Sequence, residues 1–265
     1  MAKFMILGPL EVVSQDRGRV SLAPKLRQVL ALLVLCANRV VHIDLLIEEL
    51  WGTRPPRSAV TTTQTYIHQL RKIIAPEEAD NPGATIITKS PGYVLYVDPK
   101  QVDAFVFQRR VWQGRKFLDN GDATEAARIF RQSLEMWRGP ALTDVTPGRI
   151  LEAHVVPLEE ERLRALELRI QADLRLGLHR ELIGELRSLA ASHPLNEWFH
   201  AQLISALSQA GRRNDALRAY QNLRTTLSGE LGLEPSPELQ RLQREVLSAG
   251  CPPPRRAGEP VASVT

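Results

Sequence analysis

A stretch near residue 60 combines hydrogen-bonding side chains with an absence of acids. No Asp or Glu occurs between Glu49 and Glu77. Basic residues do fall in this interval, at Arg54, Arg57, Arg71 and Lys72. Short polar side chains fill much of the rest, including Thr61, Thr62, Thr63, Gln64, Thr65, His68 and Gln69. Because an ordinary exposed helix mixes both signs of charge, this composition indicates a surface that approaches phosphates and base edges.

These side chains belong to a segment that is expected to be a helix over residues 58–75. Ser58 can cap its first turn. Its apolar residues recur at helical spacing and would anchor it to a core: Val60, Ile67, Leu70 and Ile74. The polar side chains of the helix would then be exposed and available to a partner.

A hairpin is predicted directly after this helix. Residues 76–83 read as a loop, and residues 85–88 and 93–97 read as strands around a turn at 89–92. The turn carries a lysine. A basic-tipped hairpin that follows a polar helix is the outline of a winged helix-turn-helix.

The elements before the polar helix complete a small α and β domain. Short strands are expected at residues 4–7, 10–13 and 20–22. A helix begins near Pro24, and a second spans residues 43–51, where Gly52 and the following prolines end it. The sequence therefore predicts a DNA-binding domain over residues 1–99.

From residue 103 onward the chain reads as helical, with an internal repeat. Gly121 and Gly211 are each followed by a small residue five positions later and an aromatic residue four after that. A weaker copy starts at Gly177, 34 residues before Gly211, which is the tetratricopeptide period. We expect an all-helical, tetratricopeptide-like domain over residues 100–249 and a Pro-rich tail over 250–265 that is disordered by composition.

Bulk composition gives weaker information. The formal net charge is only +4, so the position of charge matters more than its sum. Of the two cysteines, Cys36 lies in an apolar helical run and is expected to be a buried thiol, which fits a reducing cytoplasm. The longest apolar run, residues 29–37, is too short to span a bilayer, and no signal-peptide core is present. We therefore expect a cytoplasmic, nucleoid-associated protein without a membrane partner.

Enzyme motifs are missing from the sequence. The six histidines are scattered without metal-binding spacing, and neither Gly-x-Ser-x-Gly nor Gly-x-Gly-x-x-Gly occurs. The acidic run at 159–161 adjoins arginines, as is usual in a solvated helix. We predict no catalytic activity, no metal and no cofactor.

Several runs in order resemble the Streptomyces antibiotic regulatory proteins. In the N-terminal third these are residues 24–33, 45–52, 62–72 and 91–93. Further along, the chain resembles the bacterial transcriptional activation domain of that family at residues 137–142, 158–163, 193–197, 211–220 and 230–237. The likeness spans about residues 3–248. No Gly-x-x-x-x-Gly-Lys-Ser/Thr run occurs, so the chain resembles the small, stand-alone type without a nucleotide-hydrolysing module.

The resemblance implies an OmpR-like DNA-binding fold and an activator that works without a phosphorelay. It implies direct-repeat operators, a dimer on DNA, recruitment of RNA polymerase holoenzyme through its sigma and alpha subunits, and control of an antibiotic or other secondary-metabolite gene cluster. The residues that it places against base edges are Thr61, Gln64, Thr65 and His68. Those that it places on the DNA backbone are Trp51, Arg54, Arg57, Gln69, Arg71 and Lys72. The wing tip is Lys89 and Ser90.

Three alternatives stay open at this point. Trp51 is as well explained by packing at a helix end as by a DNA contact. The loop that contains Gly52, Arg54 and Arg57 suits an acidic patch on polymerase, but it could be a plain connector. The whole chain could also be a protein-interaction adaptor, which the lack of acids around residues 50–76 disfavours.

Overall fold

The computed structural model describes residues 3–14, 18–74 and 83–248, and the protein is mainly helical with two small sheets. Most of the predicted 76–83 loop and the predicted 250–265 tail lie outside the described residues. The chain forms two compact units, Met1–Ala172 and Asp173–Thr265. The expected boundary at residue 99 falls inside the first unit. No helix in the described ranges has the length and apolar character needed to cross a membrane.

The N-terminal sheet is antiparallel in the order β1 (Lys3–Met5), β2 (Glu11–Ser14), β3 (Gly18–Arg19). The first strand ends earlier than expected because the backbone N–H groups of Ile6 and Leu7 donate to the Asp103 carboxylate, at 2.8 and 3.1 Å. The strand predicted at 20–22 is wrong. Gly18, at φ 66°, starts the pairing earlier, and the chain leaves the sheet after Val20 donates to the Val12 carbonyl at 3.2 Å.

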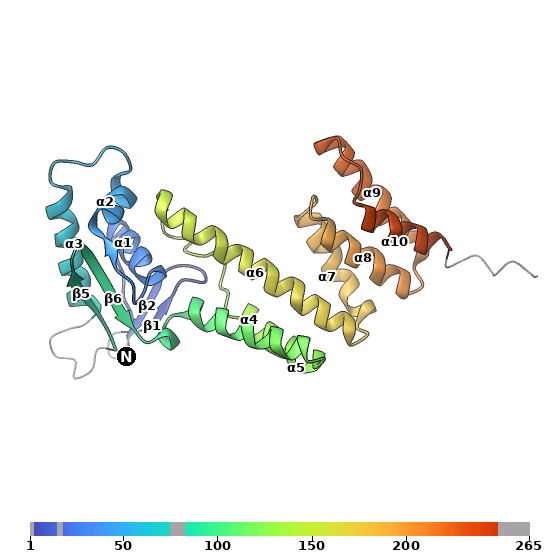
Figure 1. The fold of residues 1–265 in the computed structure, drawn as a ribbon, viewed down its shortest axis with the longest axis horizontal. Helices are drawn as coiled ribbons and strands as arrows, with labels where there is room; N and C mark the ends of the chain where they lie inside the picture. Colours follow the sequence, from blue (N-terminus) through green and yellow to red (C-terminus); the bar gives the residue numbers. More distant parts are fainter. Residues whose placement is uncertain (1–2, 15–17, 75–82, 249–265) are drawn as a thin grey trace, which may run out of the picture. The chain divides into compact units, whose positions relative to one another are not determined.

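Three helices and a hairpin form the winged helix. They are α1 (Pro24–Leu35), α2 (Ile43–Trp51) and α3 (Ala59–Ile74), and a second sheet of β4 (Val41–His42), β5 (Ala84–Lys89) and β6 (Gly92–Val97). The sheet order is β4-β6-β5, and Figure 1 shows α3 beside the β5–β6 hairpin. The predicted helices and the hairpin are confirmed within one or two residues, because local signals define their ends.

The buried side of α3 differs from the prediction in its first turn. Its buried residues are Ala59, Thr63, Ile67, Leu70 and Ile74. Val60, expected to anchor the helix, is 47% exposed. From Ile67 back to Thr63 and from Thr63 back to Ala59 the buried positions are four residues apart, which is more than the 3.6 residues of one helical turn. The row of buried residues therefore winds slowly around the helix, and in the first turn it includes Ala59 and not Val60. Thr63 tolerates burial because its hydroxyl donates to the Ala59 carbonyl at 2.8 Å.

Cys36 also departs from its prediction. It is half-buried at the C-terminal cap of α1, with its sulfur 3.6 Å from His154 Nε2. The thiol lies outside the apolar interior of the helix because α1 ends one residue earlier. Burial raises the pKa of the Cys36 thiol, and the nearby Arg39 charge partly opposes that shift.

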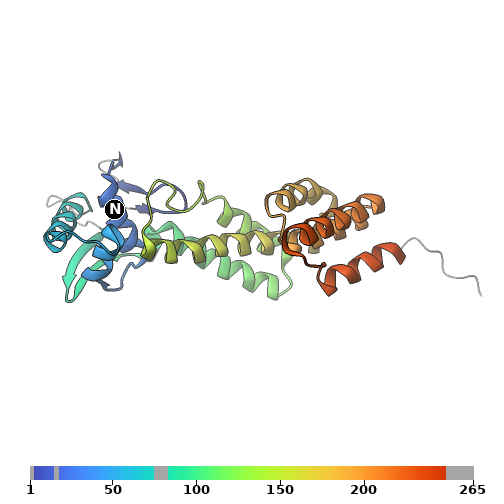
Figure 2. The same cartoon turned by 90° about the horizontal axis from the view of Figure 1, so that it is seen from above.

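The remaining helices carry the repeat. The short helix η1 (Pro99–Gln101) is followed by α4 (Asp103–Asp119), α5 (Ala123–Leu134) and α6 (Arg149–Arg175). In both views α6 runs beside α4 and α5 (Figures 1 and 2). The second unit contains α7 (His179–Ser192), α8 (Glu197–Gln209), α9 (Arg213–Leu231) and α10 (Pro237–Ser248).

The repeat predicted from glycine spacing is confirmed. Gly121, Gly177 and Gly211 have φ values of 86°, 80° and 77°, a region open to glycine at no steric cost, and each precedes a helix. The small and aromatic positions of the two stronger copies are buried: Ala126, Phe130, Ala216 and Tyr220. The glycine turns the chain, and the two buried positions pack the paired helices.

Candidate nucleic-acid interface

The candidate interface is the exposed face of α3. The side chains expected at base edges are all exposed: Thr61, Gln64, Thr65 and His68. Their spacings of three, one and three residues place them on one face, opposite the buried stripe. The structure therefore brings together the four residues that the family resemblance placed on bases, and Gln69 and Lys72 are exposed further along the same helix.

Thr65 presents its methyl group more readily than its hydroxyl. The hydroxyl donates to the Thr61 carbonyl at 3.0 Å, one turn back in the helix. A hydroxyl engaged in this way has less capacity for a new contact, whereas the methyl group keeps its full surface. The arrangement suits apolar contact with a thymine methyl, beside the bidentate amide of Gln64.

Arg71 ties α3 to the wing. Its Nε donates to the Ile86 carbonyl and a terminal nitrogen donates to the Thr88 hydroxyl, both at 2.8 Å. The guanidinium carbon also lies 6.0 Å from the centroid of the Tyr93 ring. A phosphate contact by Arg71 stays a prediction, but these bonds make it first a positioning residue. Sequence reasoning missed this role, because charge alone does not distinguish a bond to the wing from one to DNA.

The wing is held against the rest of the domain next to its turn. Gly92 pairs with His42 in the β4–β6 register, and a Cβ added to Gly92 would lie 1.9 Å from the Val41 carbonyl oxygen. Only glycine allows this approach of the two strands. At the other end of the turn, Lys89 and Ser90 are exposed, as a wing tip that reaches a neighbouring groove requires.

The loop between α2 and α3 is open to solvent. Gly52 takes φ 61° at the end of α2, and Arg54 and Arg57 are exposed. Trp51, by contrast, is half-buried and packs against the hydrophobic core. Packing is therefore the role that the structure shows for Trp51, and its DNA contact stays a prediction.

Buried polar contacts fix α2, and with it the start of this loop. Lys25 Nζ donates to the Leu50 carbonyl at 2.6 Å. Gln28 donates to the Glu49 carbonyl and to its carboxyl group, at 2.8 and 2.9 Å. The same carboxyl group accepts from three backbone N–H groups at the start of α6, those of Gly148, Ile150 and Leu151, at 2.6 to 3.0 Å. Glu49 thus caps α6 from within the winged helix.

Two more carboxylates join the N-terminal sheet to the helices that follow. Asp103, at the start of α4, accepts from Ile6 and Leu7. Burial raises the pKa of Asp103, against the opposing effect of these N–H groups. Asp144 accepts from the Leu10 N–H at 2.6 Å and pairs with Arg27 at 2.7 Å. The candidate interface therefore rests on a frame that includes the first helices after it.

Comparison with known proteins decides the family. The family described as "Bacterial transcriptional activator domain" matches residues 102–247, and "Transcriptional regulatory protein, C terminal" matches residues 17–95. The regulatory protein DnrI of Streptomyces peucetius is 44% identical over 92% of this chain and 91% of its own length. The chain belongs to the Streptomyces antibiotic regulatory protein family of transcriptional activators.

A second relative and a solved structure support the same family and fold. The transcriptional regulator RedD of Streptomyces coelicolor is 36% identical over 92% of this chain and 69% of its own length. The solved structure of Mycobacterium tuberculosis EmbR, in complex with a low affinity phosphopeptide, matches with a TM-score of 0.87 at 32% identity. The match covers 94% of this chain and 65% of the EmbR chain. The predicted OmpR-like winged helix with a helical activator domain is therefore confirmed.

Proposed function

We propose that this family member binds duplex DNA through α3 and the wing and activates transcription from the bound site. One observation carries the proposal: the base-edge candidates lie together on an exposed helix face in a segment without acids. Such a face can enter a major groove, where amide and methyl groups distinguish base pairs. Lys72 and Gln69 on α3, and Lys89 on the wing, would bind phosphates and set the register without reading sequence.

The proposal is tested by titrating labelled duplexes with the full chain at two salt concentrations. We expect binding to an operator, located by footprinting promoters near the chain's own gene, and a steep loss of affinity as salt rises. A matched duplex with a scrambled operator should bind more weakly and with a similar salt slope. Binding that ignores salt, or is equal on both duplexes, would reject base reading by α3 and favour a protein-interaction adaptor.

We further propose direct-repeat operators, occupied by two copies head to tail, with half-sites about one helical turn apart. The targets would be antibiotic or other secondary-metabolite genes, and the protein would work in the cytoplasm on the nucleoid. Support comes from the family membership and from the relatives DnrI and RedD, which are a regulatory protein and a transcriptional regulator. Changing the spacing between half-sites by half a turn should abolish paired occupancy while single half-sites still bind.

The α2–α3 loop is the proposed contact with RNA polymerase, through an acidic patch on its sigma or alpha subunit. Gly52, Arg54 and Arg57 are exposed there, and buried bonds to α2 hold the start of the loop in place. Arg54→Ala with Arg57→Ala should reduce run-off transcription at saturating DNA occupancy. Unchanged transcription under full occupancy would show that the loop is only a connector.

A further inference from the structure

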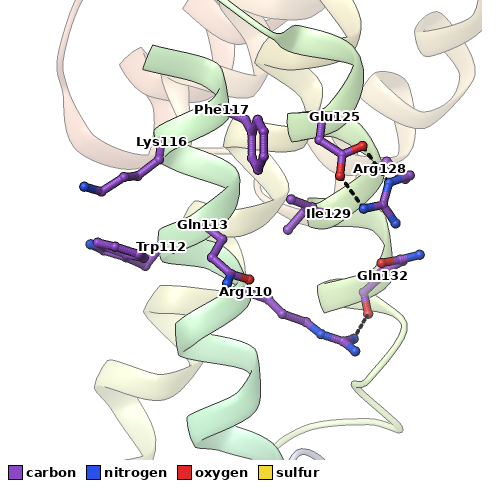
Figure 3. A pocket seen from close by; sticks show the side chains of 9 residues that line it. All are labelled: Arg110, Trp112, Gln113, Lys116, Phe117, Glu125, Arg128, Ile129 and Gln132. Carbon is purple, nitrogen blue, oxygen red and sulfur yellow. Dashed lines mark hydrogen bonds and ion pairs between the residues drawn. The ribbon is translucent and has the colours of Figure 1, made fainter. Parts of the chain in front are cut away.

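A groove between α4 and α5 exposes aromatic and basic side chains that the DNA-binding proposal does not use. Its volume is about 440 Å³. Trp112 and Phe117 are 58% and 38% exposed along it. Figure 3 shows Phe117 on α4 facing Glu125 and Ile129 across the groove, whereas Trp112 lies beside Lys116 and points away from α5. Large exposed aromatic residues close to arginines are typical of protein-binding surfaces.

The second compact unit contains a groove of similar size, about 450 Å³, bounded by α7, α8 and α9. Its lining repeats that of the first groove at an offset of 90 positions, the distance from Gly121 to Gly211. On the second helix of each repeat, Glu125, Arg128 and Gln132 correspond to Asp215, Arg218 and Asn222. On the first helix, Arg110, Gln113 and Phe117 correspond to His200, Leu203 and Leu207.

Packing of the repeat does not require the matched polar side chains of the second helix, which are all at least partly exposed, whereas Leu203 and Leu207 of the first helix are buried. The residues that join the paired helices are others, Ala126 and Phe130 in the first repeat, and these are buried. The middle repeat also forms its helix α7, yet it has Gly184 at the position of Arg128 and Arg218. An arginine present at two of three equivalent positions, and exposed in a groove each time, points to recognition of a ligand.

The charges that line the α4–α5 groove indicate which class of ligand it can bind. Arg110, Lys116 and Arg128 line it against a single acid, Glu125, which pairs with Arg128 through Nε at 2.8 Å. Lys116 Nζ lies 4.4 Å from the centroid of the Trp112 ring. The excess of positive charge suits carboxylates, which arginine can bind with two parallel hydrogen bonds.

The floor of the groove is apolar and would accept a hydrophobic anchor. Phe117 and Ile129 form it in the first groove, where Leu207 and Ala219 stand in the second. An amide, Gln132 or Asn222, lies at the end of each row and can both donate to and accept from a peptide backbone. An apolar floor beside a carboxylate is a poor site for a nucleic-acid backbone.

We propose that the α4–α5 groove binds an acidic peptide segment of a partner protein, with an apolar side chain seated on Phe117 and Ile129. The matching groove of the second unit is a second, less aromatic site for the same kind of segment. This inference does not depend on the DNA-binding role of α3. It gives the repeats a binding role, for acidic peptide segments, in addition to their structural role.

The test is fluorescence anisotropy with the full chain and a labelled peptide. The probe has ten residues, in which Asp and Glu flank one Phe and one Leu. Two comparison peptides replace either the acids by Lys or the Phe and Leu by Ser. We expect saturable binding of the acidic anchored peptide and at least about tenfold weaker binding of both comparison peptides.

Variants of the chain then locate the site. Arg110→Glu combined with Lys116→Glu, and separately Trp112→Ala, should each weaken the tighter binding phase about tenfold or more. Arg241→Glu combined with Arg244→Glu, an equal charge change on the exposed side of α10, is the matched control and should change binding less than about twofold. Circular dichroism of each variant verifies that the helices form.

The second groove is tested with Arg187→Glu combined with Arg218→Glu, which should remove only the weaker phase. Absence of saturable binding up to about 1 mM peptide would overturn the proposal. So would equal losses in the groove and control variants, or full displacement of the peptide by random duplex DNA. Each of these results would be compatible with unimpaired operator binding, so failure here is distinguishable from failure of the DNA-binding proposal.

Discussion

Two polar regions of the winged helix differ in where their hydrogen bonds go. At the junction of α2 with α6, the Glu49 side chain is buried and accepts from Gln28 and from three backbone N–H groups. On the outer face of α3, Gln64 and His68 are exposed to solvent, and the Thr65 hydroxyl is bonded only within its own helix. The first region is complete within the protein, whereas the second is available to a partner.

The difference shows how to separate framework from function among polar residues of similar type. A buried acceptor with several internal donors stabilises the fold, because removing it leaves each donor unsatisfied. An exposed polar side chain contributes little to folding but can supply specificity on binding. Stability and DNA affinity should therefore respond to different substitutions, as the following predictions specify.

Breaking the buried junction should have the largest effect. Glu49→Leu leaves the N–H groups of Gly148, Ile150 and Leu151 without an acceptor, and should lower the free energy of unfolding by about 3 kcal/mol or more. Urea denaturation followed by far-UV circular dichroism measures the loss. Glu48→Gln, which removes only the exposed pair with Arg149, is the control and should cost at most about 1 kcal/mol. Equal losses would show that Glu49 is not a framework residue.

Altering the outer face of α3 should change affinity and leave stability unaffected. Gln64→Ala should weaken operator binding by about 1–3 kcal/mol and relax specificity at one base pair. Thr65→Val, which keeps the methyl group and loses the hydroxyl, should bind nearly as well as the parent, whereas Thr65→Ser should not. Anisotropy titrations on specific and scrambled duplexes provide the measurement. Equal losses on both duplexes for Gln64→Ala would remove it from base reading.

Neighbouring basic residues at the end of α3 sharpen the contrast. Lys72→Ala should weaken binding to all duplexes alike and reduce the salt slope by about one. Arg71→Ala should instead lower stability by about 1–2 kcal/mol, because it removes the two bonds to Ile86 and Thr88. Salt-dependent titration and thermal unfolding distinguish the two. Identical behaviour of the two variants would mean that the Arg71 bridge has no positioning role.

The smallest expected effect concerns pH. Within the described part of the chain, His200 Nε2 is buried without a hydrogen-bond partner. Burial lowers the pKa of His200 below its ordinary 6.5, although the Pro194 and Ala190 carbonyls and Glu197 oppose this. The folded state then favours the neutral ring, so stability is unaffected above the unfolded pKa and falls as pH drops below it toward the folded pKa.

The measurement compares urea midpoints of the parent and of His200→Gln between about pH 5 and pH 7.5, where histidine titrates. The parent should lose stability toward acid relative to the variant. If the difference between the two is independent of pH, His200 does not control this part of the profile.

Much of the fold was predictable because its signals are local. Pro24 and Gly52 define helix ends, and the glycines at 121, 177 and 211 precede the repeat helices. The exposed side of α3 also followed from a short interval of sequence without acids. Val60 shows the limit of this reasoning, since apolar character and approximate spacing did not decide which residue of the first turn is buried.

The sequence by itself determined which elements form and which helix has a polar face without acids, because helix caps, periodicity and charge act between residues close in the chain. Only the tertiary structure decided which polar residues stabilise the fold. Asp103 meets Ile6 across 97 positions, Asp144 meets Leu10 across 134 and Glu49 meets Leu151 across 102. The same holds for the Arg71 bridge to the wing and for the paired grooves of the repeats. A carboxylate or an arginine looks the same in sequence whether its partner is water, DNA or a distant backbone N–H, and only the folded chain supplies that partner.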